Sequence, residues 1–110
     1  MNTYFLQEIL KKNIVQYDKE KNIIQYYIKN DGFIDVSLPE FANLCKFWVL
    51  KYGFVLSSFQ LNENIGICRL FSQHEIINNV LDEVKDISET MAIIKCSENL
   101  FLNFKNKEIL

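Results

Sequence analysis

Three cysteines and one histidine are the residues of this chain whose chemistry could support nucleophilic catalysis. A cysteine nucleophile needs a lowered thiol pKa and a base, normally histidine, within hydrogen-bonding distance. The only histidine is His74, and Cys68 is the thiol nearest to it in the sequence. Cys45, Cys68 and Cys96 each lie in an apolar run and form no CxxC pair, as buried, reduced thiols do. We therefore predict no catalytic cysteine and a reducing, cytoplasmic location.

The carboxylates form no spacing that indicates a metal centre or an acid–base pair. A metal site is expected to draw two or more histidine or cysteine ligands from short spacings, and the chain has a single histidine. Asp82 and Asp86 are four residues apart and offer a weak hard-cation site as an alternative to a solvated helix face. Two further pairs lie in predicted turns, where they favour solubility: Asp18 with Glu20, and Asp31 with Asp35. We expect no metal, no cofactor and no enzymatic activity.

Glycine and lysine spacing argues against nucleotides and nucleic acids as ligands. The three glycines are isolated, so neither a GxGxxG nor a P-loop motif exists. Lysines do alternate with tyrosines near the N-terminus, which is a pattern that holds single-stranded nucleic acid. However, the formal net charge is −2 and Arg69 is the only arginine, whereas nucleic-acid surfaces are basic and rich in arginine. We expect neither nucleic acid nor a small-molecule substrate.

The first half of the chain has clear helix and strand signals. Apolar residues at helical spacing predict a first helix to about residue 12. The segments 14–17 and 23–28 read as a hairpin around a charged turn, and 33–36 returns as a third strand after Asn30-Asp31-Gly32. Ser37, Pro39 and Glu40 then form a helix start with a capping box, and the second helix ends at Gly53. Trp48 lies on its apolar side.

The second half predicts a further hairpin, a third helix and a last hairpin. Strands over 54–61 and 65–71 flank an Asn62-Glu63-Asn64 turn. Ser72-Gln73-His74-Glu75 has capping-box spacing, and it precedes an apolar stripe of helical period: Ile76, Ile77, Val80, Leu81, Val84 and Ile87. The segments 91–96 and 100–104 then form two strands turned at 97–99.

These elements predict one α+β domain over residues 1–110. Its antiparallel sheet is built from hairpins, with about three helices packed on one face, in the order helix, three strands, helix, two strands, helix, two strands. With 49% hydrophobic residues the chain has enough apolar surface for one core. No run approaches the roughly 18 apolar residues of a membrane span, so we expect no membrane partner.

Charge asymmetry gives the most useful hint of a partner. Acidic residues outnumber basic ones over 75–98, and the outer face of the predicted third helix carries Asp82, Glu83, Asp86 and Glu89. Such a rim steers a basic protein, while aromatic anchors supply affinity. The tyrosine-rich hairpin with Tyr17, Tyr26 and Tyr27 is the alternative binding surface.

Size, acidity and the lack of catalytic motifs favour a small cytoplasmic inhibitor. We expect an immunity-protein or antitoxin-like neutraliser of a basic toxin such as a nuclease. One alternative is a phage-encoded inhibitor of a host defence enzyme. The other is a dimeric, chaperone-like adaptor that holds a segment of a secreted effector by strand addition. The abundance of Ile, Asn and Lys is typical of AT-rich genes in mobile bacterial loci.

Overall fold

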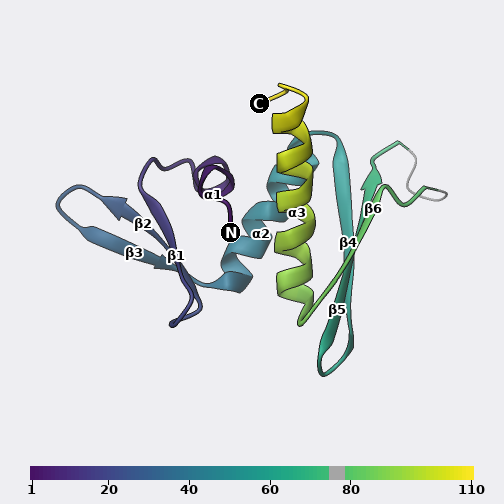
Figure 1. Ribbon diagram of the computed structural model, residues 1–110, viewed down its shortest axis with the longest axis horizontal. Helices are drawn as coiled ribbons and strands as arrows, with labels where there is room; N and C mark the ends of the chain where they lie inside the picture. The colour runs from purple at the N-terminus through teal and green to yellow at the C-terminus, as the bar shows by residue number, and fades with distance from the viewer. Residues whose placement is uncertain (75–78) are drawn as a thin grey trace.

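The computed structural model describes residues 1–74 and 79–110. Along the chain (Figure 1) the helices and strands are α1 (Thr3–Leu10), β1 (Val15–Asp18), β2 (Ile23–Ile28), β3 (Gly32–Val36), α2 (Leu38–Lys51), β4 (Phe54–Asn62), β5 (Ile65–Ser72), β6 (Asp82–Asp86) and α3 (Glu89–Asn106). The predicted α+β class is confirmed, and the predicted order is confirmed from α1 to β5.

Local signals in the sequence explain why the helices start and stop where they do. The Asn2 side chain accepts the Phe5 N–H at 3.1 Å and begins α1. Ser37 accepts the Glu40 N–H at 3.3 Å and begins α2, with Pro39 in its first turn. Gly53 follows the end of α2 with a φ of +87°, which a residue with a Cβ rarely adopts. The expected N-cap, proline and terminal glycine of α2 are therefore all present.

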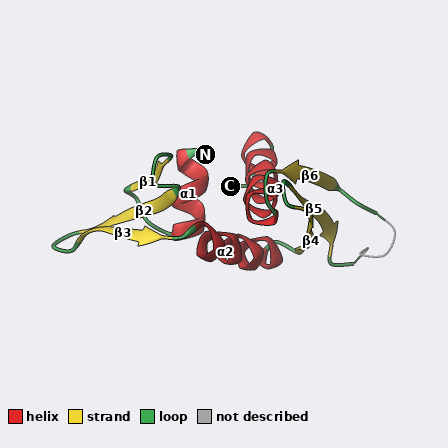
Figure 2. Cartoon of the chain, turned by 90° about the horizontal axis from the view of Figure 1, so that it is seen from below, coloured by secondary structure: helices red, strands yellow, loops and turns green. Residues whose placement is uncertain are grey.

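The helices form a central layer between two antiparallel sheets. One sheet has the order β1-β2-β3 and the other β4-β5-β6. Figures 1 and 2 show the β1–β3 sheet beside α1 and α2, and the β4–β6 sheet beside α3 on the opposite side. The predicted single sheet with helices on one face is wrong, because α2 carries the chain across the layer between β3 and β4. Each sheet covers a different side of the helices.

One hydrophobic core joins all three helices to both sheets. The residues with the least exposed side chains include Phe5 of α1, Ile24 of β2, Phe41 of α2 and Ile94 of α3. Trp48 is buried as expected, with its ring centroid 5.1 Å from that of Tyr52 and 6.0 Å from that of Phe104. Its indole N–H donates to Glu8 of α1 at 3.3 Å. The core is therefore centred where α2 meets α1 and α3.

The predicted third helix over 76–87 is wrong in its described part, because Asp82–Asp86 is the strand β6. Ile76 and Ile77 of the expected stripe, and Glu75 of the capping box, lie outside the described residues. Val80, Leu81 and Ile87 are exposed and not core residues. Val84 alone packs on the core, since it pairs with Cys68 across β5 and β6.

The predicted last hairpin over 91–104 is also wrong, because these residues lie within the continuous helix α3. Ser88 caps that helix by accepting the Met91 N–H at 3.1 Å. The predicted turn at 97–99 is helical, and the Ser97 hydroxyl donates to the Ile93 carbonyl one turn earlier at 2.8 Å. Burial of residues three and four apart, over Ile93, Ser97 and Leu100, provides the packing that holds this segment helical.

Candidate functional site

The four predicted acidic rim residues do not share one face. Asp82, Glu83 and Asp86 belong to strand β6, where side chains alternate between the two sides of the sheet, and Glu89 begins α3. Asp82 accepts the Asn99 amide at 3.3 Å, and Glu89 accepts the Ser58 hydroxyl at 2.7 Å. These carboxylates make internal contacts, so the helical rim expected from the sequence does not exist.

Glu83 is the rim residue that lies on the outer side of the β4–β6 sheet. It pairs with Arg69 across β5 and β6, and the Arg69 Nε donates to its carboxylate at 2.6 Å. That hydrogen bond lowers the pKa of Glu83. The carboxylate stays ionised and forms a salt bridge with Arg69 of the same sheet.

The three predicted tyrosines divide between the two sides of the β1–β3 sheet. Tyr17 and Tyr26 lie on the inner side, partly buried against the core. The Tyr17 hydroxyl donates to Asn22 at 2.7 Å, and the Lys12 ammonium lies 5.4 Å from the centroid of the Tyr26 ring. Tyr27 points outward, with 41% of its surface exposed. Of the three, Tyr27 is the one placed to meet a partner.

The outer side of the β1–β3 sheet combines an aromatic pair with a row of polar side chains. Tyr27 pairs with Phe33 across β2 and β3, and their rings meet edge to face with centroids 5.5 Å apart. Phe33 is 47% exposed. We call this surface the aromatic–amide face; its outward-pointing strand residues are Gln16, Asp18, Ile23, Gln25, Tyr27, Phe33 and Asp35.

Hydrogen bonds across all three strands hold the polar part of the aromatic–amide face in place. The Gln16 amide donates to Gln25 at 2.6 Å, and the Gln25 amide donates to Asp35 at 2.7 Å. Asp18 and Asp35 are the charged members, and no lysine or arginine points outward from these three strands between residues 15 and 36. The face therefore offers carboxylate acceptors beside exposed aromatic surface. That combination suits a protein surface rich in lysine or arginine.

The three cysteines are buried and unbridged, as the sequence indicates. Burial raises the pKa of the Cys45 thiol far above its ordinary value, and the neighbouring Ser97 hydroxyl opposes this only in part. The contact with Cys68, together with burial, raises the pKa of the Cys96 thiol in the same direction. Cys68 itself is fully buried in β5, whereas His74 lies exposed in the turn after it. The Cys45 and Cys96 thiols are therefore held protonated.

We predict that the folded protein resists alkylation. Because the side chains of Cys45, Cys68 and Cys96 are fully buried, the reagent reaches them only when the structure opens. Iodoacetamide should therefore label the native chain at least about a hundredfold more slowly than the chain in denaturant. Mass spectrometry of timed samples measures the number of labelled cysteines, and a small cysteine peptide at the same pH calibrates the reagent. Rapid labelling of Cys45, Cys68 or Cys96 in the native protein would contradict their assignment to the core.

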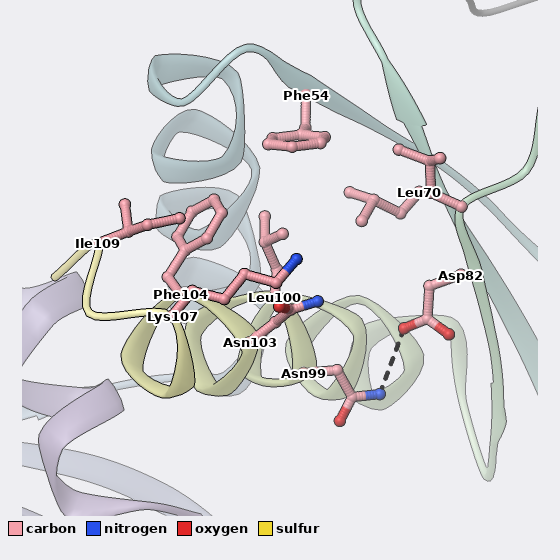
Figure 3. A pocket seen from close by; sticks show the side chains of 10 residues that line it. Phe54, Leu70, Asp82, Asn99, Leu100, Asn103, Phe104, Lys107 and Ile109 are labelled. Atoms are coloured by element: carbon pink, nitrogen blue, oxygen red, sulfur yellow. Dashed lines mark hydrogen bonds between the residues drawn. The ribbon is translucent and has the colours of Figure 1, made fainter.

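A pocket of about 700 Å³ opens between the C-terminal half of α3 and the β4–β6 sheet. Figure 3 shows Phe54, Leu70 and Phe104 around its apolar part, and the Asn99 to Asp82 hydrogen bond at one side. Its polar lining consists of amides, one carboxylate and the Lys107 ammonium. The ten lining residues include no thiol, hydroxyl or imidazole group, so the pocket can orient an apolar ligand but offers it no nucleophile of these kinds.

Among residues 1–74 and 79–110, no group of three or more His, Cys, Asp or Glu side chains is placed to hold a metal ion. None of the helices within those same residues has both the length and the apolar character of a membrane span. Comparisons of the chain with protein-family models, with curated proteins and with solved structures find no match.

Proposed function

We propose that this chain is a small protein-binding domain that neutralises a basic toxin such as a nuclease, in the manner of an immunity protein or antitoxin. It docks through the aromatic–amide face. The observation that carries the proposal is the exposed Tyr27 and Phe33 pair beside Asp35, on strands whose outward side chains include no cation. Aromatic anchors and acidic neighbours are what a lysine-rich active-site surface binds best.

The hydrogen-bonded row through Gln25 supports this use of the face. Side chains that are already fixed lose less conformational freedom on binding, so a larger part of the contact energy appears as affinity. Gln25 is fixed on both sides, since it accepts from Gln16 and donates to Asp35. The aromatic pair is likewise fixed by its edge-to-face contact. A rigid face of this kind favours tight, specific inhibition over transient contact.

A phage-encoded inhibitor of a host defence enzyme would use the same face, with a different basic target. The dimeric adaptor remains a second candidate, because one observation favours it. Helix α2 exposes Leu44, Phe47 and Leu50 to solvent, and a dimer needs exposed apolar surface of this kind. Edge strands β3 and β4 would provide the sites for strand addition.

The partner experiment uses the proteins encoded beside this chain, since toxins and their inhibitors are commonly produced together. Binding of each purified product is measured by calorimetry, and nuclease activity is measured with and without the chain. We expect one product to bind tightly and to lose activity. Tyr27→Ala and Phe33→Ala should each weaken that complex by about thirtyfold or more, as truncated hot-spot residues do.

Tyr4→Ala is the matched control, because Tyr4 is 64% exposed but lies on α1. It should leave the affinity within about threefold of the wild type. Asp35→Lys should lower the association rate of the complex, and added salt should lower the association rate of the wild type, since charge steers the encounter. If no neighbouring product binds, or if Tyr27→Ala and Phe33→Ala bind as tightly as Tyr4→Ala, the proposal is wrong.

A further inference from the structure

Helix α2 carries a solvent-facing stripe that no part of the described chain covers. Phe47 is 71% exposed, the highest value among the large apolar side chains of the described residues. Leu44 is exposed beside it, and Leu50 flanks them on the same side of the helix. Figure 2 shows α2 at the lower boundary of the molecule, with no other helix or strand beneath it. The stripe therefore lies open on a broad face of a chain whose extents are 49 × 37 × 19 Å.

The stripe has opposite charges at its two ends. Glu40, Leu44, Phe47 and Lys51 follow one another at intervals of four, three and four residues, so they lie in a straight line along the helix. All four are exposed. The acid is at the N-terminal end and the base at the C-terminal end, about 16 Å apart at 1.5 Å per residue. A straight apolar segment with one charge at each end is complementary to its own reverse.

We propose that a second copy of this chain covers the stripe, with the two α2 helices packed antiparallel about a two-fold axis. This arrangement places Leu44 of each copy against Phe47 of the other, and Glu40 of each copy opposite Lys51 of the other. A parallel pair would instead place Glu40 beside Glu40 and Lys51 beside Lys51, which like charges disfavour. The charge pattern therefore favours a second copy of this chain as the partner and an antiparallel direction of the two helices.

The size of the contact sets the expected strength. A single pair of 14-residue helices buries less than the roughly 1,600 Å² of a standard stable interface. The dimer is therefore reversible, with a dissociation constant on the order of 10 to 100 μM. This dimer uses α2 and not the aromatic–amide face. The dimer proposal can therefore be supported or contradicted independently of the proposed toxin neutralisation.

Sedimentation velocity from about 10 μM to about 1 mM tests the proposal on the full chain. The wild type should shift from monomer to dimer across that range, and Phe47→Glu should stay monomeric throughout. Tyr4→Glu is the matched control, because it places the same charge at an exposed aromatic position on α1; it should dimerise like the wild type. Circular dichroism should give equal helix content for all three proteins, since both positions are largely exposed.

Charge exchange tests the antiparallel register. Glu40→Lys and Lys51→Glu should each weaken the dimer by about tenfold, because each creates a like-charge contact at both ends of the pair. The double variant should return to within about threefold of the wild type. A wild type that stays monomeric at about 1 mM, a Phe47→Glu protein that still dimerises, or a double variant no better than the singles would each overturn the proposal.

Discussion

Replacement of Gly66 by alanine is expected to lower the free energy of unfolding by about 3 kcal/mol, although it adds only one methyl group. A Cβ at this position would lie inside van der Waals contact of the backbone of Ser88 and Glu89, where α3 begins. Backbone atoms cannot rotate away as the end of a side chain can. Either α3 or strand β5 must move, and both belong to the core.

Other contacts fix the start of α3 at the same place, so the helix cannot simply shift. The Gln60 side chain accepts the Glu89 N–H at 2.7 Å, and the Ser58 hydroxyl donates to the Glu89 carboxylate at 2.7 Å. Both residues lie on β4, and Gln60 pairs with Gly66 across the sheet. Displacement of α3 to admit a methyl group would stretch these hydrogen bonds and loosen the packing behind them.

Urea unfolding monitored by circular dichroism measures the effect, with Gly32→Ala as the control. Gly32 has a φ of +77° but no heavy atom within 4 Å of a new Cβ, so alanine there meets backbone strain without a clash. We expect that control to cost about 1 kcal/mol. If Gly66→Ala were no less stable than Gly32→Ala, the close approach of α3 to β5 would be wrong.

The first half of the chain could be predicted because its signals are local and agree with one another. Ser37, Pro39 and Glu40 mark the start of α2, and Gly53 marks its end, within a few residues of sequence. The Asn30-Asp31-Gly32 turn sets the register that places Tyr27 opposite Phe33. Phe33 was missed as a site residue, although that turn and the alternation of the strands already place it beside Tyr27.

The C-terminal part could not be predicted in this way because its signals conflict. Val80, Leu81, Val84 and Ile87 fit a helical period, yet the Arg69–Glu83 pair and the Cys68–Val84 pair belong to a strand. Ile93 and Ile94 favour strand by propensity, but their packing holds them in α3. Contacts with distant residues decide between these alternatives, and distant contacts leave no local pattern.

Glu98 illustrates how such contacts escape sequence analysis. It lies in a segment that resembles a turn, but in α3 it is buried and accepts the backbone N–H of Asn2 at 2.7 Å. The Lys95 ammonium, 3.1 Å away, balances its charge. The hydrogen bond from Asn2 to Glu98 joins residues 96 positions apart. The shared acidic face was expected for the same reason. Asp82, Glu83, Asp86 and Glu89 would lie on one face only if the segment were helical, and Asp82–Asp86 is a strand.

Trp48→Ala is expected to lower the free energy of unfolding by about 3 to 5 kcal/mol, the range for removing a large buried aromatic ring. The indole ring contacts the rings of Tyr52, Phe101 and Phe104, so its loss leaves a cavity between α2 and α3. It also removes the hydrogen bond that Glu8 of α1 accepts. Thermal and urea unfolding of the variant measure the loss.

Leu81→Ala is the control that separates the core seen in the structure from the one that the sequence suggests. Leu81 belongs to the apolar stripe of the predicted third helix, where truncation would cost as much as at any core leucine. In the structure 46% of its surface is exposed, because it precedes strand β6 at the rim of the pocket. We therefore expect Leu81→Ala to lower the free energy of unfolding by about 1 kcal/mol or less. Equal losses of stability for Trp48→Ala and Leu81→Ala would contradict the exposed position of Leu81 and would support the predicted third helix, because an exposed leucine has too few packing contacts to match a buried tryptophan.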